Sequence, residues 1–440
     1  MSEVVFRGGT ILTIDPASQV LAGDVAVVDG AIVHVGGTYQ PRGRGYEVID
    51  CEGCVVMPGL VQAHVHLCQT LARGRADDLE LLDWLRQVIW PYEAALDARA
   101  MAASAELGCA ELLRGGTTAI LDMGTVHHYD EVFAAAERTG LRLTGGKAMM
   151  DADDDLTPAG LRETTAASLD ESARLLERWH GAAGGRLRYA YAPRFALSCT
   201  EELLREVGRQ APLRGVRIHT HASENLAEIA EVRRRHGTDN LSYLAACGIC
   251  GPHCTLAHCV HVDDAGMARL AADGTHVCHC PSSNLKLASG IAPVPELLAA
   301  GVSVAIGADG APCNNNLDGL LELRLAALLH KKPSRGPRTL PAPVVVRMAT
   351  MGGARALGLD AQIGSLEVGK RGDVIAVDTS TLHATPAEDP HSLVAYAVRA
   401  SDVRHVAVDG QLVVRDRALL TVDADAVRDR ARAAARRLWS

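Results

Sequence analysis

Imidazole and carboxylate side chains stand at the ends of several apolar segments of this 440-residue chain. The first such segment ends in His64-Val65-His66. Because side chains alternate along a β-strand, both imidazoles lie on one face and can bind one metal ion. Later segments end in the same residue types, at His219 and His221, His258 and His261, His279, and Asp309. A single His-x-His pair is weak evidence, but this repetition indicates a metal site, since so many buried rings would otherwise each need a polar partner.

Eight strand-like segments alternate with helical ones in the middle of the chain. They are 55–67, 117–123, 141–150, 187–193, 216–222, 254–260, 276–280 and 302–308. This alternation predicts the α/β class and a (β/α)₈ TIM barrel, whose active site lies at the carboxyl ends of the strands. A doubly wound open sheet is the alternative, but the Gly-rich turn typical of its first strand is missing. The leucines of 320–329 predict a helix with a wide apolar stripe that leaves Glu322 outside.

The two ends of the chain contain similar strand-rich segments. Strands are predicted at 4–15, 24–35, 365–378 and 403–414, and the dipeptides Asp29-Gly30 and Asp409-Gly410 favour tight hairpins. We therefore expect one small β-sandwich domain assembled from both termini. The predicted division is 1–57 for its N-terminal part, 58–362 for the barrel and 363–440 for its C-terminal part. The last segment, 428–439, is expected to form a basic helix with a solvated face.

Composition excludes several classes of protein. Hydrophobic residues make up 48% and charged residues 22%, as in ordinary globular chains. A net charge of -9 and only 3% aromatic residues argue against a nucleic-acid partner. The N-terminus lacks the pattern of a secretory signal, and no apolar run is long enough to span a membrane, so we expect a cytoplasmic protein without a membrane partner. The twelve cysteines, including Cys51-x-x-Cys54, are expected to be packing residues.

Longer motifs resemble those of the amidohydrolase superfamily, specifically its metal-dependent aminohydrolases of purines, purine nucleosides and related heterocycles. The motifs are PGLVQAHVH at 58–66, HTHASEN at 219–225, LAHCVH at 256–261, HCPSSNLKLASG at 279–290 and GADGAPCNN at 307–315. The resemblance covers essentially the whole chain, and the β-domain built from both termini is also a family feature.

The resemblance implies that one divalent metal ion, zinc or alternatively iron, is bound by His64, His66, His221 and Asp309. Three neutral imidazoles and one carboxylate leave a position for water, whose pKa the cation lowers. The same comparison by position makes Asp309 the proton acceptor, Glu224 the proton shuttle and His258 the residue that orients the nucleophile. A helix cap is the alternative role for Glu224. A second metal bridged by a lysine is disfavoured, since the fourth strand contains no lysine.

Six further residues are predicted to contact substrate. Glu93 occupies the place where adenosine-type deaminases bind ribose hydroxyls, although guanine deaminases carry a glutamate near it too, and it could instead be a helix-start carboxylate. Gln69, Arg194 and Phe195 resemble the base-reading residues of guanine deaminases. Lys147 and His279 complete the predicted set. The acidic stretch 151–155 is expected to be a solvated loop near the barrel mouth.

Together these features predict a hydrolytic deaminase of a 6-aminopurine nucleoside, either adenosine or a 5'-modified form such as 5'-methylthioadenosine, 5'-deoxyadenosine or S-adenosylhomocysteine. One alternative is a deaminase of guanine or another aminated heterocycle, such as a pterin or a triazine. The other is a homologue that binds metal without catalysis. The expected partners are a small aminopurine or nucleoside and further copies of the chain, in a homo-oligomer.

Overall fold

The larger of two β-sheets forms a barrel of parallel strands. A computed structural model describes residues 2–41, 45–152, 157–386 and 388–439. Within this part of the chain, the strand order is β14-β13-β12-β11-β10-β8-β7-β6-β15, and β9 (Ala148–Met149) pairs with β10. The strands are β6 (Leu60–His66), β7 (Thr117–Met123), β8 (Arg142–Gly146), β10 (Leu187–Pro193), β11 (Arg217–Ala222), β12 (Cys254–His258), β13 (His276–His279), β14 (Val304–Ile306) and β15 (Asp309–Gly310).

The barrel is closed by the segment that contains the predicted ligand Asp309. Strand β14 pairs with β13, whereas β15 pairs with the first barrel strand and places Asp309 opposite Val65. Gly307 connects β14 to β15, and a Cβ there would lie 2.6 Å from the carbonyl oxygen of His64. A side chain at this position would therefore push Asp309 away from β6. Each of the eight predicted strands is present, and the predicted (β/α)₈ barrel is confirmed.

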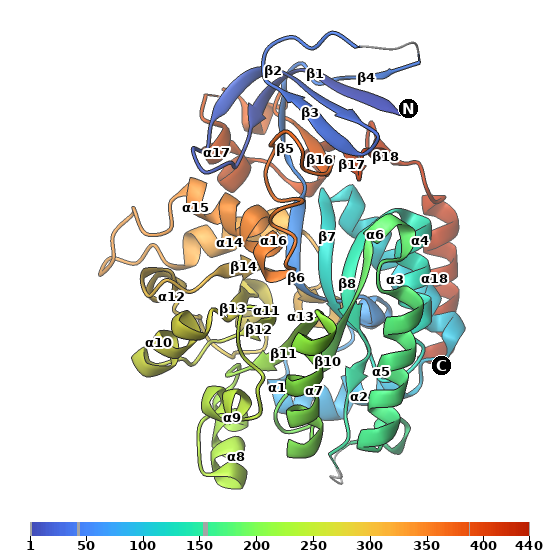
Figure 1. Cartoon of the computed structure of the whole chain (residues 1–440), viewed down its shortest axis with the longest axis vertical. Coiled ribbons are helices and arrows are strands. Elements are labelled where there is room, and N and C mark those ends of the chain that lie inside the picture. The colour runs from blue at the N-terminus through green and yellow to red at the C-terminus, as the bar shows by residue number, and fades with distance from the viewer. Residues whose placement is uncertain (1, 42–44, 153–156, 387, 440) are drawn as a thin grey trace.

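Helices surround the barrel in the order expected for this fold (Figure 1). The principal ones are α3 (Ala98–Arg114), α4 (Tyr129–Thr139), α5 (Thr165–Trp179), α7 (Glu201–Arg214), α8 (Leu226–His236), α9 (Asn240–Ala246), α10 (Asp264–Asp273), α12 (Val294–Ala299), α14 (Gly319–Leu329) and α15 (Ala342–Arg347). Many begin at an Asp, Thr or Asn whose side chain accepts a backbone N–H, as Asp97 does for α3. Such a cap fixes the residue at which a helix begins.

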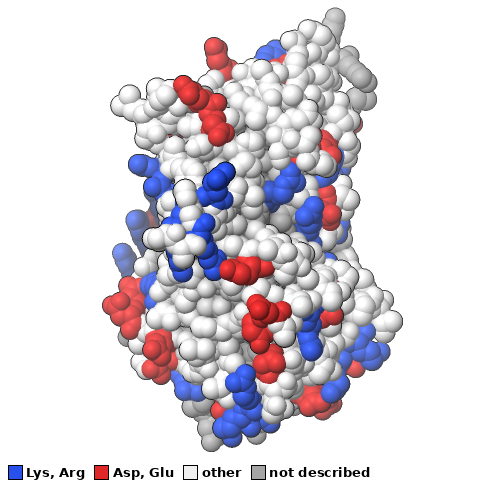
Figure 2. Space-filling view, turned by 90° about the vertical axis from the view of Figure 1, so that its left-hand side faces the viewer, with Lys and Arg blue, Asp and Glu red and all other residues white. Residues whose placement is uncertain are grey.

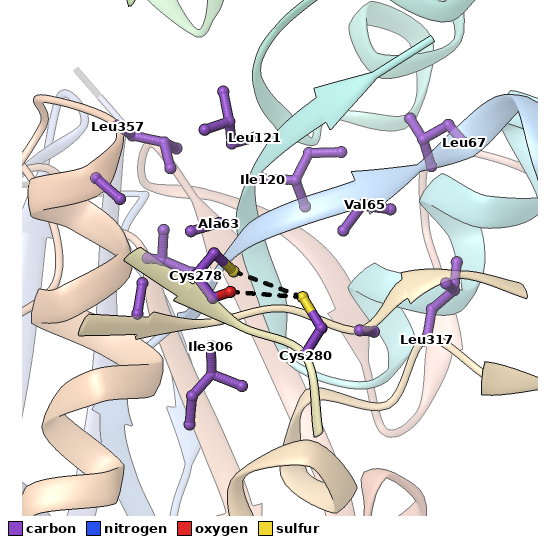
Figure 3. Packing of buried hydrophobic residues seen from close by; sticks show 14 of the residues in the cluster. Ala63, Val65, Leu67, Ile120, Leu121, Cys278, Cys280, Ile306, Leu317 and Leu357 are labelled. Atoms are coloured by element: carbon purple, nitrogen blue, oxygen red, sulfur yellow. Dashed lines mark hydrogen bonds between the residues drawn. The ribbon is translucent and has the colours of Figure 1, made fainter. Parts of the chain in front are cut away.

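Alternation along β6 separates the packing residues from the histidines. Ala63, Val65 and Leu67 are buried in the apolar layer with residues of β7, as Figure 3 shows. His64 and His66 point to the opposite face, because successive side chains of a strand do so. In the same layer, Cys278 Sγ and Cys280 Sγ lie 4.0 Å apart (Figure 3). All twelve cysteines are free thiols, in agreement with the predicted packing role.

One residue of the predicted leucine-rich helix lies on the unexpected side. Helix α14 spans almost the predicted residues, but Glu322 is fully buried, whereas Leu321 and Leu328 are exposed. The Glu322 carboxylate accepts hydrogen bonds from the Ser282 N–H and the Asn314 amide, at 3.1 and 3.0 Å. Burial raises the pKa of Glu322 to about 7. The prediction that Glu322 lies outside the buried stripe is wrong, because polar partners distant in the sequence satisfy its carboxylate.

Strands from both ends of the chain form the second sheet, at the top of Figure 1. Its order in the described residues is β19-β18-β17-β16-β5-β1-β2-β3, with β4 beside β1. The bounds are β1 (Glu3–Leu12), β2 (Val20–Val28), β3 (Ala31–Val35), β4 (Glu47–Asp50), β5 (Cys54–Pro58), β16 (Val374–Asp378), β17 (Val403–Val408), β18 (Gln411–Arg415) and β19 (Ala418–Leu419). The predicted β-domain built from both termini is therefore present, and its strands bond into one continuous sheet that encloses a core of its own.

The two predicted hairpins meet inside this β-domain. Asp29 and Gly30 have φ values of 48° and 80°, and Asp409 and Gly410 have 56° and 76°. Positive φ at both central positions is the conformation that tight hairpins of this type require. A Cβ on Gly410 would lie 2.8 Å from the Cα of Gly30, so the two turns are in direct contact. The two halves of the sheet are joined by antiparallel pairing of β5 with β16, and the two turns add a contact between them.

The C-terminal helix α18 (Ala424–Leu438) packs against α3 and is less solvated than predicted (Figure 1). Val427, Ala431 and Ala434 are buried, and only the arginine-rich side faces solvent. The Trp439 ring stacks on Tyr92 at a centroid distance of 5.5 Å. Helix α18 therefore has one solvated side, as expected, and one side that packs against the barrel helix α3.

Charged side chains of both signs are interspersed on the face shown in Figure 2. This distribution agrees with the modest net charge of the chain. Among the described residues, none of the helices combines the length and apolar character needed to cross a bilayer.

A buried ion pair links the barrel to the β-domain and gives a test of the packing. Arg142 of β8 donates to both carboxylate oxygens of Asp373, at 2.9 and 2.8 Å. We expect Arg142→Ala to lower the free energy of unfolding by about 3–5 kcal/mol, because it leaves the Asp373 charge buried without its partner. Arg234, which pairs with Glu231 at the surface, is the control, and Arg234→Ala should cost less than about 1 kcal/mol. Urea denaturation measures both, and equal losses would contradict the role of Arg142.

Candidate active site and metal centre

The four predicted metal ligands lie together at the carboxyl ends of the barrel strands. Asp309 Oδ1 is 3.2 Å from His64 Nε2 and 3.3 Å from His66 Nε2. His66 Nε2 is also 3.3 Å from His221 Nε2, which comes from β11. Three strands that are far apart in sequence therefore direct three imidazoles and one carboxylate at a common point.

Each ligand imidazole is oriented through its other ring nitrogen. The Nδ1 atoms lie within hydrogen-bond distance of three different acceptors: His64 Nδ1 is 2.8 Å from His219 Nε2, His66 Nδ1 is 2.7 Å from the Met123 carbonyl, and His221 Nδ1 is 2.6 Å from the Arg194 carbonyl. A proton on Nδ1 leaves the Nε2 lone pair free for a cation. His219 is a further functional residue, and its position two residues before His221 on β11 is the sequence signal that places both rings on one face.

The protonation states of the cluster fit a divalent cation. Burial lowers the pKa of His64 and His221, and that of His66 to about 4, so the imidazoles are neutral. Burial alone would raise the pKa of Asp309, but His64, His66 and His258 hold it well below its usual value. His64 Nε2 is buried and makes no well-aligned hydrogen bond within the described residues, although Asp309 Oδ1 lies 3.2 Å away. A donor set of neutral imidazoles and one carboxylate is typical of zinc or iron sites.

Glu224 and His258 stand side by side next to this cluster. His258 Nε2 is 3.4 Å from Glu224 Oε2 and 3.9 Å from Asp309 Oδ2. Burial raises the pKa of Glu224 to about 7. Burial would lower the pKa of His258, but the carboxylates of Glu224 and Asp309 outweigh it and raise that pKa. The helix after β11 is capped by Asn225, whose side chain accepts the Ala227 N–H, so Glu224 is not the cap.

One cavity gives access to these groups. Its polar lining includes His66, His221, Glu224, His258 and Asp309, all of which belong to the clusters described above. The remaining lining combines the apolar residues Leu81, Trp84, Leu85, Phe195 and Leu287 with the charged residues Arg194 and Glu228. A cavity with apolar residues in its wall and a few converging polar groups suits a heterocycle. The leucines and Trp84 were not predicted, since apolar residues near a helix start give no functional signal.

Three of the predicted substrate residues form one buried network. Arg194 donates to both oxygens of Glu93, at 2.5 and 3.1 Å, and Gln69 donates to Glu93 Oε1 at 2.9 Å. Burial would raise the pKa of Glu93, but Arg194 and Gln69 outweigh it and lower that pKa. Of the three, Arg194 lines the cavity, whereas Gln69 and Glu93 lie behind it.

Two other predicted substrate residues are not brought to the cavity. The Lys147 ammonium is buried and donates to Glu163 at 2.7 Å and to Ser168 at 3.3 Å. Its ammonium is already paired with Glu163 inside the protein, and its contact with substrate stays a prediction. His279 is also fully buried and lies beside His330, at a ring distance of 5.9 Å, outside the cavity lining. Burial lowers the pKa of His279 to about 3.

The acidic stretch 151–155 begins inside the protein rather than in a solvated loop. Asp151 is 8% exposed and accepts hydrogen bonds from the Thr200 N–H at 2.7 Å and the Thr165 hydroxyl at 2.7 Å. Residues 153–155 lie outside the described part of the chain. The first residue of the stretch thus holds two helix starts in place.

Comparisons with known proteins agree with this geometry. The profile of the Amidohydrolase family matches residues 55–413. A 5-methylthioadenosine/S-adenosylhomocysteine deaminase from Syntrophobacter fumaroxidans is 41% identical, with 99% of this chain and 98% of that protein covered. A 5'-deoxyadenosine deaminase from Methanothermobacter thermautotrophicus is 42% identical, with 99% of each covered. The crystal structure of an adenosine deaminase from Xanthomonas campestris with bound zinc has a TM-score of 0.90 and 32% identity, with 99% and 98% covered.

Removal of the cation should destabilise the protein, because the clustered donor groups lose a shared partner. A cation present at 1,000 times its Kd would stabilise the fold by about 4 kcal/mol. We expect chelator-treated protein to melt at a lower temperature and to recover when zinc is returned. His66→Ala should recover far less, whereas His253→Ala, a partly buried histidine outside the cavity, should behave as the parent does. Calorimetry with metal analysis measures this, and equal recovery in both variants would contradict the ligand role of His66.

Proposed function

The chain belongs to the amidohydrolase family, and we propose that it is a hydrolytic deaminase of a 6-aminopurine nucleoside. It is a metal-dependent hydrolase of carbon–nitrogen bonds in cyclic amidines. The observation that carries the proposal is the arrangement in one cavity of a cation-binding donor set, a buried glutamate and a histidine. All the groups that the family resemblance requires are present, which disfavours a homologue that binds metal without catalysis.

We propose that His64, His66, His221 and Asp309 hold one zinc ion, with iron(II) as the alternative. When bound, the cation lowers the pKa of a water molecule and so supplies a nucleophile at neutral pH. The neutral imidazoles donate their Nε2 lone pairs, and the ionised Asp309 supplies the negative charge. The partners of the Nδ1 atoms keep these rings from turning away.

Proton movement is the task of Glu224, His258 and Asp309. The reaction adds water at the ring carbon that bears the amine and releases ammonia, so a proton must reach a ring nitrogen and then the leaving amine. A carboxyl with a pKa of about 7 can accept and return a proton at neutral pH, as Glu224 requires. His258 Nε2, 3.4 Å from Glu224, is placed to orient the incoming water. Asp309 Oδ2 lies on the same side and can accept a proton from it.

The choice of nucleoside rests on the named relatives and on the cavity. Relatives 41% and 42% identical over nearly the whole chain are named as deaminases of 5'-methylthioadenosine, S-adenosylhomocysteine and 5'-deoxyadenosine. The apolar wall formed by Leu81, Trp84 and Leu85 suits an uncharged 5'-substituent. Lys147 is bound to Glu163 and is not available to a homocysteine carboxylate. We therefore favour adenosine, 5'-deoxyadenosine or 5'-methylthioadenosine over S-adenosylhomocysteine.

Deamination of guanine or a related oxo-purine is a second candidate, favoured by the Arg194 network. Glu93, the predicted ribose ligand, is held by Arg194 and lies behind the cavity, whereas Arg194 itself lines the cavity. A guanidinium fixed in this way can donate to a carbonyl oxygen of a base. We further propose that the protein acts in the cytoplasm as a homo-oligomer on small molecules, without nucleic-acid or membrane partners.

Loss of the glutamate shuttle should abolish turnover without removing the cation. We expect Glu224→Gln to lower kcat by at least about 100-fold, since general acid–base catalysis contributes roughly that much or more. Bound zinc, measured by elemental analysis, should be unchanged, because Glu224 is not a proposed ligand. Glu206→Gln, at a surface glutamate that pairs with Arg209, is the control and should retain full activity. Retained activity in Glu224→Gln would remove the shuttle role.

A substrate panel separates the two candidate functions. Adenosine, 5'-methylthioadenosine, S-adenosylhomocysteine, 5'-deoxyadenosine and guanine are incubated with zinc-loaded protein, and released ammonia is measured. We expect turnover of at least one nucleoside, and turnover of guanine alone would overturn the nucleoside choice. Glu93→Ala should then reduce kcat/KM for nucleosides more than for bases, by about 1.5–3 kcal/mol per lost charged hydrogen bond. Equal reductions would indicate that Glu93 orders Arg194 and does not bind sugar.

A further inference from the structure

We propose that two adjacent residues, Ser283 and Asn284, are positioning residues that set the orientation of Asp309 and His258. They lie in helix α11 (Pro281–Lys286), in a motif that the proposed catalytic roles do not use. Both side chains are fully buried. The inference deepens the proposed function and rests on it, since Asp309 and His258 are its proton-handling groups.

Ser283 determines which oxygen of Asp309 faces the imidazoles. Its hydroxyl donates to Asp309 Oδ2 at 2.6 Å. The other oxygen, Oδ1, is the one that lies 3.2 Å from His64 Nε2 and 3.3 Å from His66 Nε2. The Gly310 N–H also donates to Oδ1, at 2.7 Å, so each oxygen has its own donor and the carboxylate cannot rotate freely about its Cβ–Cγ bond. Ser283 therefore presents Oδ1 to the cation site and keeps Oδ2 on the side of His258, 3.9 Å from its Nε2.

Asn284 determines where His258 carries its proton. The side-chain oxygen of Asn284 lies 2.9 Å from His258 Nδ1. Because an amide oxygen accepts hydrogen bonds and cannot donate them, Nδ1 carries the proton in this contact. Nε2, which is 3.4 Å from Glu224 Oε2, is then the ring nitrogen that faces the cavity. A reversed tautomer would put a fixed proton on Nε2 and leave its lone pair facing Asn284.

The helix start that carries both residues is itself held firmly. The Asn284 N–H donates to the Cys280 carbonyl at 3.0 Å, and the Asn284 carbonyl accepts the Ser289 N–H at 2.9 Å. The neighbouring Ser282 N–H donates to the buried carboxylate of Glu322 at 3.1 Å. Consecutive residues of a helix point about 100° apart, so Ser283 and Asn284 can reach groups from two different strands. One rigid turn thus fixes a carboxylate from β15 and an imidazole from β12.

The two contacts make separable predictions in the full-length, zinc-loaded protein. Ser283→Ala should lower zinc affinity and kcat by about 10- to 100-fold, the usual cost of losing a partner of a metal ligand. Asn284→Leu should lower kcat by a similar factor while zinc affinity stays that of the parent, because His258 is not a proposed ligand. KM should change little in both variants. Competition with a chelating dye measures zinc affinity, and ammonia release measures kcat and KM.

Conservative variants and a matched control distinguish positioning from a general loss of stability. Ser283→Thr keeps the hydroxyl and Asn284→Asp keeps an oxygen acceptor, so both should recover a large part of the lost activity. Ser172→Ala removes a buried hydroxyl that donates to the Ser168 carbonyl at 2.7 Å in α5, and it should change neither zinc affinity nor kcat. If the losses of zinc affinity and kcat are proportional to the fall in melting temperature in every variant, including Ser172→Ala, the proposal is overturned.

Nitrogen NMR of histidine-labelled protein tests the tautomer without any turnover. The His258 signals, assigned by their absence from His258→Gln, should show a protonated Nδ1 in the parent. In Asn284→Leu this preference should be lost. An unprotonated Nδ1 in the parent, or parent-like zinc affinity in Ser283→Ala, would overturn the corresponding half of the proposal. If the parent deaminates no compound, the proposed function fails, while zinc affinity and the NMR signals still decide the positioning roles.

Discussion

The charge of one buried carboxylate is the constraint on which the active site depends. Asp309 is 4% exposed, and an isolated ion at such a position would be strongly destabilised. His64, His66 and His258 hold its pKa well below the usual range, and a divalent cation in the donor cluster would stabilise the charge further. The strand that carries Asp309 also closes the barrel against β6. Asp309 therefore both carries the buried negative charge of the site and lies on the strand that closes the barrel.

Different environments give the two cavity carboxylates different roles. Asp309 lies among imidazoles and stays ionised, whereas Glu224 has less compensation and its pKa is raised to about 7 by burial. Two carboxyl groups whose pKa values are pushed apart are typical of acid–base catalysis. His258 lies between them and contacts both. Neighbouring side chains orient these groups: His219 contacts His64, Ser283 donates to Asp309, and Asn284 contacts His258.

The sequence predicted the parts of the protein that depend on local pattern. Alternation placed His64 and His66 on one face of their strand, and the Asp-Gly dipeptides predicted two hairpins that both occur. Contacts between distant residues could not be predicted in this way. Lys147 is neutralised by Glu163, Glu322 is satisfied by Ser282 and Asn314, and Arg194 binds Glu93, which is 101 residues away in the chain. The tertiary structure determines each of these pairings, and neither a sequence motif nor the hydrophobic periodicity predicts them.

Anomalous diffraction at the zinc edge, from crystals of the zinc-loaded protein, tests most directly whether one cation is shared by the four side chains. We expect a single peak within about 2.0–2.2 Å of the Nε2 atoms of His64, His66 and His221 and of Asp309 Oδ1. A peak at any other place, or these imidazoles and the carboxylate directed away from a common centre, would contradict the shared cation and the hydrolytic mechanism built on it.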